Sequence, residues 1–192
     1  MRKHVFFPGI MLLMIIGVVL SVGLVSCGSD QQAENKPAEA TARQSNPGSA
    51  SAGVTFAAYD VNGDLHQSSE WVGQKPVVLN FWGTWCPPCR KEIPDLVKLY
   101  EEYSVKGIEI VGLAVKDSPD RVAQYSQQAG MKWPMLMADP NIMTSLKATS
   151  GVPTTIFLDK TGKEIGRFVG MRDYDTFKSA FDALLETSAE QG

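Results

Sequence analysis

Two cysteines three positions apart, Cys86 and Cys89, are the residues of this chain best suited to chemistry. They follow an apolar run, residues 77–82, and are separated by two prolines. A strand that leads into a helix at this point places the first sulfur beside helix N-terminal N–H groups, which stabilise a thiolate and lower its pKa. The second sulfur can then attack a mixed disulfide made by the first. The spacing predicts thiol–disulfide exchange, with Cys86 attacking and Cys89 resolving.

A structural zinc site is one alternative for such a pair, and it needs about four ligands. The chain has one other cysteine, Cys27, and two histidines, His4 and His66. Cys27 and His4 lie in or beside an apolar N-terminal segment, so we expect no metal and no other cofactor. A static structural disulfide is the other alternative. A pair this close at a helix start is easily reduced, which disfavours a purely structural role.

The N-terminal segment has the composition of a signal peptide. Arg2 and Lys3 precede an apolar stretch over residues 5–24, and Leu24-Val25-Ser26-Cys27 resembles a bacterial lipobox. This pattern predicts a lipoprotein signal peptide over residues 1–26 and lipidation of Cys27. An uncleaved transmembrane anchor is the main alternative, because about 20 apolar residues can span a bilayer, and a chance buried cysteine is another. With signal peptide or anchor, the rest of the chain is expected outside the cytoplasm, where disulfides persist.

Residues 28–53 contain no large apolar side chain, so residues 27–53 are expected to be a flexible tether behind the lipidated cysteine. Hydrophobic residues at 44% and charged residues at 20% are ordinary for a globular protein. A net charge of −3 with no basic block indicates no nucleic-acid partner. We expect one domain over residues 54–188 and a short tail over residues 189–192.

Hydrophobic periodicity and turn residues predict the elements that must position the cysteines. A continuous apolar run predicts a central strand just before the pair, and the pair is expected to open a helix that Pro94 kinks and Gly107 ends. Alternating strands and helices followed by a hairpin and a helix imply a mixed sheet with helices on both faces. The expected strands are 55–59, 64–67, 77–82, 108–115, 135–137, 154–158 and 164–169, and the expected helices are 87–105, 118–129, 141–148 and one from residue 173.

This order of elements resembles the thioredoxin fold, and within it the TlpA/ResA-like membrane-anchored thiol-disulfide oxidoreductases. The matching words are Val-Leu-Asn-Phe-Trp-Gly-Thr-Trp-Cys-Pro-Pro-Cys-Arg-Lys-Glu-Ile-Pro at 78–94, Gly-Val-Pro-Thr-Thr at 151–155, and Gly-Lys at 162–163. The resemblance covers residues 54–188. It implies an α/β thioredoxin fold, a mixed central sheet flanked by helices, with an N-terminal β-hairpin and a central β-α insertion.

The resemblance also implies roles for residues around the pair. The bond before Pro153 would be cis, with Pro153 packed against the cysteines and the main chain of Val152 paired with a client polypeptide. Trp85 would lie at the rim of the site beside a partly exposed Cys86. Trp85, Pro87, Val152 and Pro153 are therefore the expected client-binding residues. Pro87 and Pro88 are expected to tune the redox potential.

Glu92 is the candidate for moving protons. ResA-like proteins carry an acidic residue at this position, six residues after the first cysteine. Thioredoxin itself has a buried aspartate at the position of Asn80, which cannot accept a proton, so the role is expected to pass to Glu92 or to water. A solvated glutamate on the helix surface is the alternative.

We therefore expect an extracytoplasmic oxidoreductase that reduces disulfides of client proteins. The resemblance implies a membrane electron donor and, among clients, cytochrome c apoproteins. A thiol peroxidase is one alternative, but peroxiredoxins have Thr or Ser three residues before the reactive cysteine and Pro seven before it, where this chain has Gly83 and Leu79. A non-catalytic metal-chaperone module is another, but its histidine would have to be the distant His66.

Overall fold

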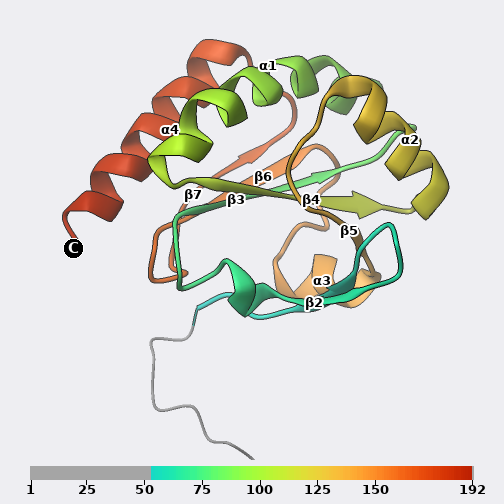
Figure 1. Cartoon of the computed structure of the whole chain (residues 1–192), viewed down its shortest axis with the longest axis horizontal. Helices are drawn as coiled ribbons and strands as arrows, with labels where there is room; N and C mark the ends of the chain where they lie inside the picture. The colour runs from blue at the N-terminus through green and yellow to red at the C-terminus, as the bar shows by residue number, and fades with distance from the viewer. Residues whose placement is uncertain (1–52, 192) are drawn as a thin grey trace, which may run out of the picture. The chain divides into compact units, whose positions relative to one another are not determined.

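The computed structural model describes residues 53–191. The expected signal peptide, Cys27 as the expected site of lipidation, and nearly all of the expected tether lie outside the described residues. Within the described part, a five-stranded sheet in the order β5-β4-β3-β6-β7 forms the centre (Figure 1). No helix in residues 53–191 combines the length and the hydropathy required to cross a bilayer.

The sheet is mixed, as the sequence predicts. Strand β3 (Val77–Trp82) pairs in parallel with β4 (Glu109–Val115), which pairs in parallel with β5 (Met135–Ala138). On its other side β3 pairs antiparallel with β6 (Thr154–Leu158), and β6 pairs antiparallel with β7 (Glu164–Val169). The hairpin of β6 and β7 turns through residues 159–163, where the backbone N–H of Val54 reaches the carbonyl of Gly162 across 3.4 Å.

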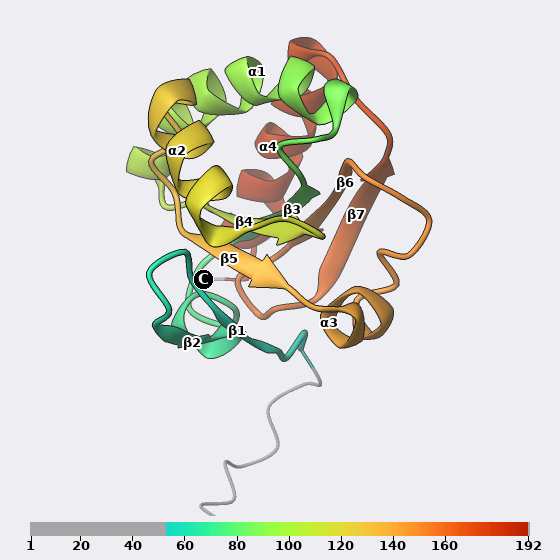
Figure 2. The ribbon, with the colours of Figure 1, turned by 90° about the vertical axis from the view of Figure 1, so that its right-hand side faces the viewer.

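Helices cover both faces of this sheet. Figures 1 and 2 show α1 (Pro87–Tyr103), α2 (Pro119–Ala129) and α4 (Tyr174–Ala189) on one face. The other face carries α3 (Pro140–Ser145) and the predicted N-terminal hairpin of β1 (Ala57–Tyr59) and β2 (Leu65–Gln67). The thioredoxin fold is therefore confirmed, with the hairpin and the β5–α3 insertion in the expected places.

All six residues of β3 are buried, which fits a central strand covered on both faces. Because side chains alternate along a strand, Val78, Asn80 and Trp82 point to one face and Val77, Leu79 and Phe81 to the other. Val78 and Trp82 pack in the core beneath α1, whereas the other three belong to the core on the opposite face. The polar Asn80 consequently lies under α1, the helix that carries the cysteine pair.

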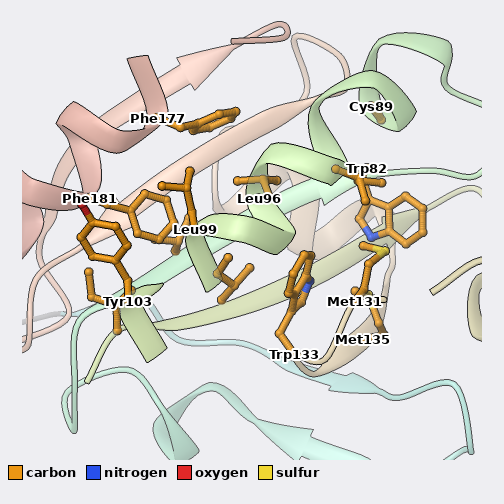
Figure 3. Close-up of a cluster of buried hydrophobic side chains, with 14 of the residues drawn as sticks. Trp82, Cys89, Leu96, Leu99, Tyr103, Met131, Trp133, Met135, Phe177 and Phe181 are labelled. Atoms are coloured by element: carbon orange, nitrogen blue, oxygen red, sulfur yellow. The ribbon is translucent and has the colours of Figure 1, made fainter. Parts of the chain in front are cut away.

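From the spacing of its apolar residues, helix α1 is expected to bury Ile93, Leu96, Val97, Tyr100 and Tyr103. Ile93, Leu96 and Tyr103 are fully buried, and so is Leu99, which lies outside that expected face. Val97 and Tyr100 are only partly buried. Figure 3 shows the reason, because Leu96, Leu99 and Tyr103 face Phe177 and Phe181 of α4 while the helix also rests on the sheet. A helix held between a sheet and a second helix buries a wider stripe than one that contacts the sheet alone.

The helix ends mostly follow the predicted signals. Gly107 and Gly130 adopt left-handed backbone conformations, with φ of 96° and 73°, just after α1 with its short 3₁₀ extension (Ser104–Lys106) and after α2. Ser118 occupies the N-cap position of α2, but its hydroxyl makes no capping hydrogen bond. The N–H of Ser118 instead donates to the carboxylate of Asp117 at 2.9 Å.

Candidate active site

The cysteine pair lies where β3 passes into α1. Residues 83–86 form the connecting turn, and Cys86 is the N-cap of α1, with an extended backbone (φ −95°, ψ 105°). The two sulfurs are joined in a disulfide with an S–S distance of 2.06 Å. The backbone N–H of Cys89 donates to Sγ of Cys86 across 3.2 Å. The helix N-terminus thus provides a donor that would stabilise a thiolate on Cys86.

The two prolines limit this stabilisation. Pro87 and Pro88 occupy the first two helical positions, and neither has a backbone N–H. Of the first three residues of α1, only Cys89 can therefore donate to the sulfur of Cys86. Pro87 and Pro88 thus reduce the number of N–H donors near the sulfur of Cys86 below that of most helix starts, and fewer donors would stabilise its thiolate less.

The expectation that Cys86 is partly exposed is wrong for the oxidised protein, in which only 2% of this residue is accessible to solvent. Its sulfur lies 3.7 Å from the carbonyl oxygen of Val152, on the loop that leads to Pro153. The peptide bond between Val152 and Pro153 is cis, as the family resemblance implies. This loop is tied down because the carbonyl of Pro153 accepts the N–H of Gly170 at 2.8 Å. The loop that contains Val152, 66 residues after Cys86 in the sequence, therefore covers the sulfur of Cys86.

Trp85 lies at the edge of the site with 51% of its surface exposed. Its indole N–H donates to the carbonyl of Val115 at the end of β4, across 2.9 Å. The ring passes so close to Gly83 that a Cβ at that position would lie 2.6 Å from the indole nitrogen. Gly83 is therefore required for this placement of Trp85, a packing reason for the glycine that follows β3.

Glu92 is not a solvated helix residue, since only 1% of it is exposed. It lies one turn after Cys89, and residues three apart on a helix are neighbours. The side-chain amide of Asn80 donates to Oε1 of Glu92 across 3.1 Å and to Oγ1 of Thr155 across 3.1 Å. Thr155 was not predicted. Its position opposite Asn80 in the pairing of β3 with β6 is the signal that could have identified it.

Burial in this apolar setting raises the pKa of Glu92 to about 7, although the hydrogen bond from Asn80 and the backbone and charge of Arg172 act in the opposite direction. Oε2 of Glu92 and Oδ1 of Asn80 are buried and have no hydrogen-bond partner within residues 53–191. A carboxyl group with a pKa near neutrality can both accept and release a proton at physiological pH. It stands beside the buried cysteine that must lose a proton during exchange.

The histidine that a metal-chaperone site would require is elsewhere. His66 belongs to β2, where its Nδ1 lies 2.8 Å from Glu70 and its ring stacks on Trp71. Trp71 packs in the core on the face of the sheet opposite to the one that holds Cys86 and Cys89. Among residues 53–191 no group of three or more His, Cys, Asp or Glu side chains is arranged to hold a metal ion.

Comparison with known proteins agrees with this geometry. Residues 51–165 match the model of the AhpC/TSA family. The chain is 34% identical over 115 residues to thiol-disulfide oxidoreductase ResA of Bacillus thuringiensis, an alignment that covers 60% of this chain and 66% of that protein. It is 33% identical over 129 residues to ResA of Geobacillus thermodenitrificans, covering 67% and 74% of the two chains.

Solved structures with the same fold include a thiol:disulfide interchange protein of the thioredoxin family from Chlorobium tepidum. That structure is 30% identical, with a TM-score of 0.63, and covers 69% of this chain and 94% of its own. A secreted thiol-disulfide isomerase from Corynebacterium glutamicum is 28% identical, with a TM-score of 0.61, and covers 69% and 84% of the two chains. These names describe thiol–disulfide chemistry, which fits the cysteine pair described above.

Proposed function

We propose, since this chain belongs to the AhpC/TSA family and is a ResA-like member of it, that it is a thiol-disulfide oxidoreductase that reduces disulfides of client proteins. The observation that carries the proposal is the position of Cys86. Its sulfur caps α1 and accepts the N–H of Cys89, so a thiolate formed there is stabilised and can attack.

The proposed reaction uses the reduced pair and transfers two electrons to the client. The Cys86 thiolate attacks one sulfur of the client disulfide, so that a mixed disulfide forms and the other client sulfur leaves as a thiolate. Cys89 then loses its proton and attacks Sγ of Cys86, which forms the internal disulfide and releases the second client thiolate. Glu92, one turn from Cys89, is the proposed acceptor of that proton. A dithiol donor must re-reduce the pair before another cycle.

The small number of donors at Cys86 supports the proposed direction of electron flow, from this protein to the client. A strong oxidant has a greatly stabilised thiolate in its reduced form. Pro87 and Pro88 leave a single N–H for Cys86 in the first three helical positions, which favours a weaker stabilisation of the thiolate and hence a reducing pair. This supports the role of a reductant over that of an oxidant.

Client binding is proposed along the loop that covers Cys86. The main chain of Val152 would pair with an extended client segment, as in other cases of strand addition to an exposed backbone. Trp85, Pro87 and Pro153 would border that segment. The exposed face of Trp85 supports this role, because its indole is fixed by Val115 and so presents a rigid apolar surface.

The cellular setting remains the one that the sequence predicts. The lipobox-like end at Cys27 supports a lipid anchor on the extracytoplasmic side of a membrane, with residues 27–53 as a tether. A membrane electron donor would keep the pair reduced in a compartment where disulfides form. Cytochrome c apoproteins, whose haem attachment requires reduced thiols, are proposed among the clients.

The reduction potential of the Cys86–Cys89 pair tests the proposal. The protein is equilibrated in thiol buffers of known potential, its free thiols are alkylated, and the oxidised fraction is read by mass. A value of about −250 mV or below supports a reductant, whereas a value of about −120 mV would indicate an oxidant. Reduced protein should also reduce a disulfide-bonded model peptide, and Cys86→Ser should abolish this. Faster oxidation by hydrogen peroxide than by the peptide would favour the peroxidase alternative.

A further inference from the structure

Asp117 is a buried carboxylate next to the turn that carries Cys86, in a position to which the proposed reaction assigns no role. It lies two residues after the end of β4, and its side chain has 0% exposure to solvent. Oδ2 accepts the backbone N–H of Thr84 at 2.7 Å. Oδ1 accepts the N–H of Ser118 at 2.9 Å and Nε–H of Arg121 at 3.0 Å. The carboxylate thus joins the turn before Cys86 to the first residues of α2.

A second hydrogen bond ties the same two segments together. The indole N–H of Trp85 donates to the carbonyl of Val115 at 2.9 Å. Residues 84 and 85 of the turn are therefore held by residues 117 and 115. Lys116, between the two anchors, has φ of 50°, a conformation that non-glycine residues seldom adopt. Lys116 therefore lies between two acceptors, the carbonyl of Val115 and the carboxylate of Asp117. Both accept hydrogen bonds from the turn over residues 83–86.

We propose that Asp117 is a positioning residue for the redox pair, which fixes residues 83–86 so that Cys86 stays at the N-cap of α1. This inference rests on the proposed function, since it concerns the reactivity of the attacking cysteine. Cys86 accepts only one N–H, that of Cys89, so its thiolate depends on a single geometry. A turn free to shift by a fraction of an ångström would weaken that hydrogen bond.

Only a carboxylate satisfies the site. Every partner of Asp117 is a donor: the N–H groups of Thr84 and Ser118 and the guanidinium of Arg121. Burial by itself would raise the pKa of Asp117, but these hydrogen bonds outweigh it and lower the pKa, so the group is ionised at neutral pH. Asparagine would direct its NH₂ group at one of these donors and lose that contact.

The charge of Asp117 and its positioning effect change the pKa of Cys86 in opposite directions, so a measurement of that pKa distinguishes them. A negative charge near Cys86 disfavours a thiolate, so an electrostatic role alone would make Asp117→Asn lower the pKa of Cys86. Loss of positioning would raise it. Arg121 offsets the charge at 3.0 Å. The charged residues of the first turns of α1 and α2 and of the segments beside the turn also include Arg90, Lys91, Glu92, Lys116, Asp120 and Arg172, and the test leaves all of them unchanged.

The experiment measures the pH dependence of iodoacetamide labelling at Cys86 in reduced protein, for the wild type and Asp117→Asn. We expect the pKa of Cys86 to rise by about one unit, which lowers the labelling rate roughly tenfold at a pH below both pKa values. An unchanged or lowered pKa would overturn the proposal. A wild-type Cys86 without a depressed pKa would instead contradict the proposed function, so the two failures are distinguishable.

Asp159→Asn is the matched control. Asp159 is also buried, and its carboxylate accepts the N–H groups of Thr161 and Lys163 in the turn between β6 and β7. That turn lies at the opposite end of the sheet from Cys86, because Leu158 pairs with Val77, the first residue of β3. Asp159→Asn should leave the labelling profile unchanged. If Asp117→Asn does not fold, Trp85→Phe, which keeps an aromatic ring but removes the hydrogen bond to Val115, should shift the profile in the same direction by a smaller amount, and no shift would overturn the proposal.

Discussion

The side-chain amide of Asn80 on β3 donates a hydrogen bond to Glu92 on α1 across 3.1 Å, and both residues are buried. The same nitrogen bonds Thr155 on β6, so the amide spans from the helix to the strand that follows the cis proline. Asn80 cannot itself accept a proton, but it fixes the carboxyl that can. The group proposed to accept the proton has therefore moved from the central strand, where thioredoxin has an aspartate, to the helix beside it.

Glu92→Gln should change how the stability of the oxidised protein depends on pH. The pKa of Glu92 rises from 4.5 to about 7 on folding, so this group favours the folded state below about pH 4.5 and that contribution is lost as the pH rises through 7. The loss is on the order of 3 kcal/mol. Relative to wild type, Glu92→Gln should thus gain about this much unfolding free energy between pH 4.5 and pH 8. Urea denaturation at both pH values measures it, and parallel wild-type and mutant curves would contradict the assignment.

Glu92→Gln should also alter the pH profile of disulfide exchange. If Glu92 accepts the proton of Cys89, the glutamine variant lacks a group that titrates near neutrality and is coupled to the thiols. The rate of exchange near neutral pH should therefore fall, and its dependence on pH should change. Stopped-flow reduction of a model peptide disulfide between pH 5 and 9 is the measurement. Glu101→Gln is the matched control, because Glu101 lies on the same helix but in solvent, paired with Lys132. A Glu92→Gln profile that overlays the wild type would assign proton transfer to water.

Asn80→Asp should destabilise the fold at high pH more than at low pH. The substitution places a second carboxyl 3.1 Å from that of Glu92 in a buried site, and two such groups cannot both ionise. It also removes the donor that satisfies Glu92. We expect a loss of about 3 kcal/mol or more at pH 8 and a smaller loss at pH 5. Asn62→Asp, which places a carboxyl 3.0 Å from that of Asp60 in the exposed hairpin turn, should show a much smaller pH dependence because solvent screens the two charges.

Cys89→Ser should trap clients as mixed disulfides through Cys86. Without the resolving thiol, the intermediate formed by Cys86 cannot collapse to the internal disulfide. Non-reducing gels of Cys89→Ser mixed with an oxidised client should show an adduct that thiol reductants release. Cys86→Ser, the control, should show none. Adducts with Cys86→Ser and none with Cys89→Ser would reverse the roles of the two cysteines.

Cys27→Ala should leave the precursor uncut at the lipobox-like site. The expectation rests on residues 24–27 and the apolar stretch before them. Intact mass of wild-type protein extracted from membranes should correspond to a chain that begins at a lipidated Cys27. A mass that corresponds to an unmodified chain from Met1 would support the uncleaved anchor instead.

The sequence predicts the framework of the site well, because strong local signals specify it. The apolar run of β3, broken only by Asn80, predicts the central strand. The prolines that open α1 and the glycines that end α1 and α2 predict the helix ends. Burial of Glu92 and Leu99 has no such signal. Burial of Leu99 depends on α4 packing against α1, a contact between residues some eighty positions apart in the chain. Burial of Glu92 depends on α1 lying on the sheet, where Asn80 of β3 donates to its carboxyl.

The tertiary contacts around the cysteines are equally invisible in the local pattern. The cover over Cys86 comes from a loop 66 residues away, and Asp117 reaches Thr84 across 33 residues. Asp117 reads as an ordinary residue before a helix, and its buried role depends on parallel strands β3 and β4 ending side by side. Spacing along one element could not have identified either contact.

The backbone hydrogen bond between Val54 and Gly162 fixes the end of the domain at which the chain enters. The first described residues enter at the turn between β6 and β7, whereas Cys86 follows the far end of β3, so the point of entry and the sulfurs lie at opposite ends of the sheet. Anything joined upstream of residue 53 therefore attaches at the pole away from the cysteines. Capture of the protein through residue 53 would therefore hold the domain at the end opposite to the cysteines and would not itself cover Cys86.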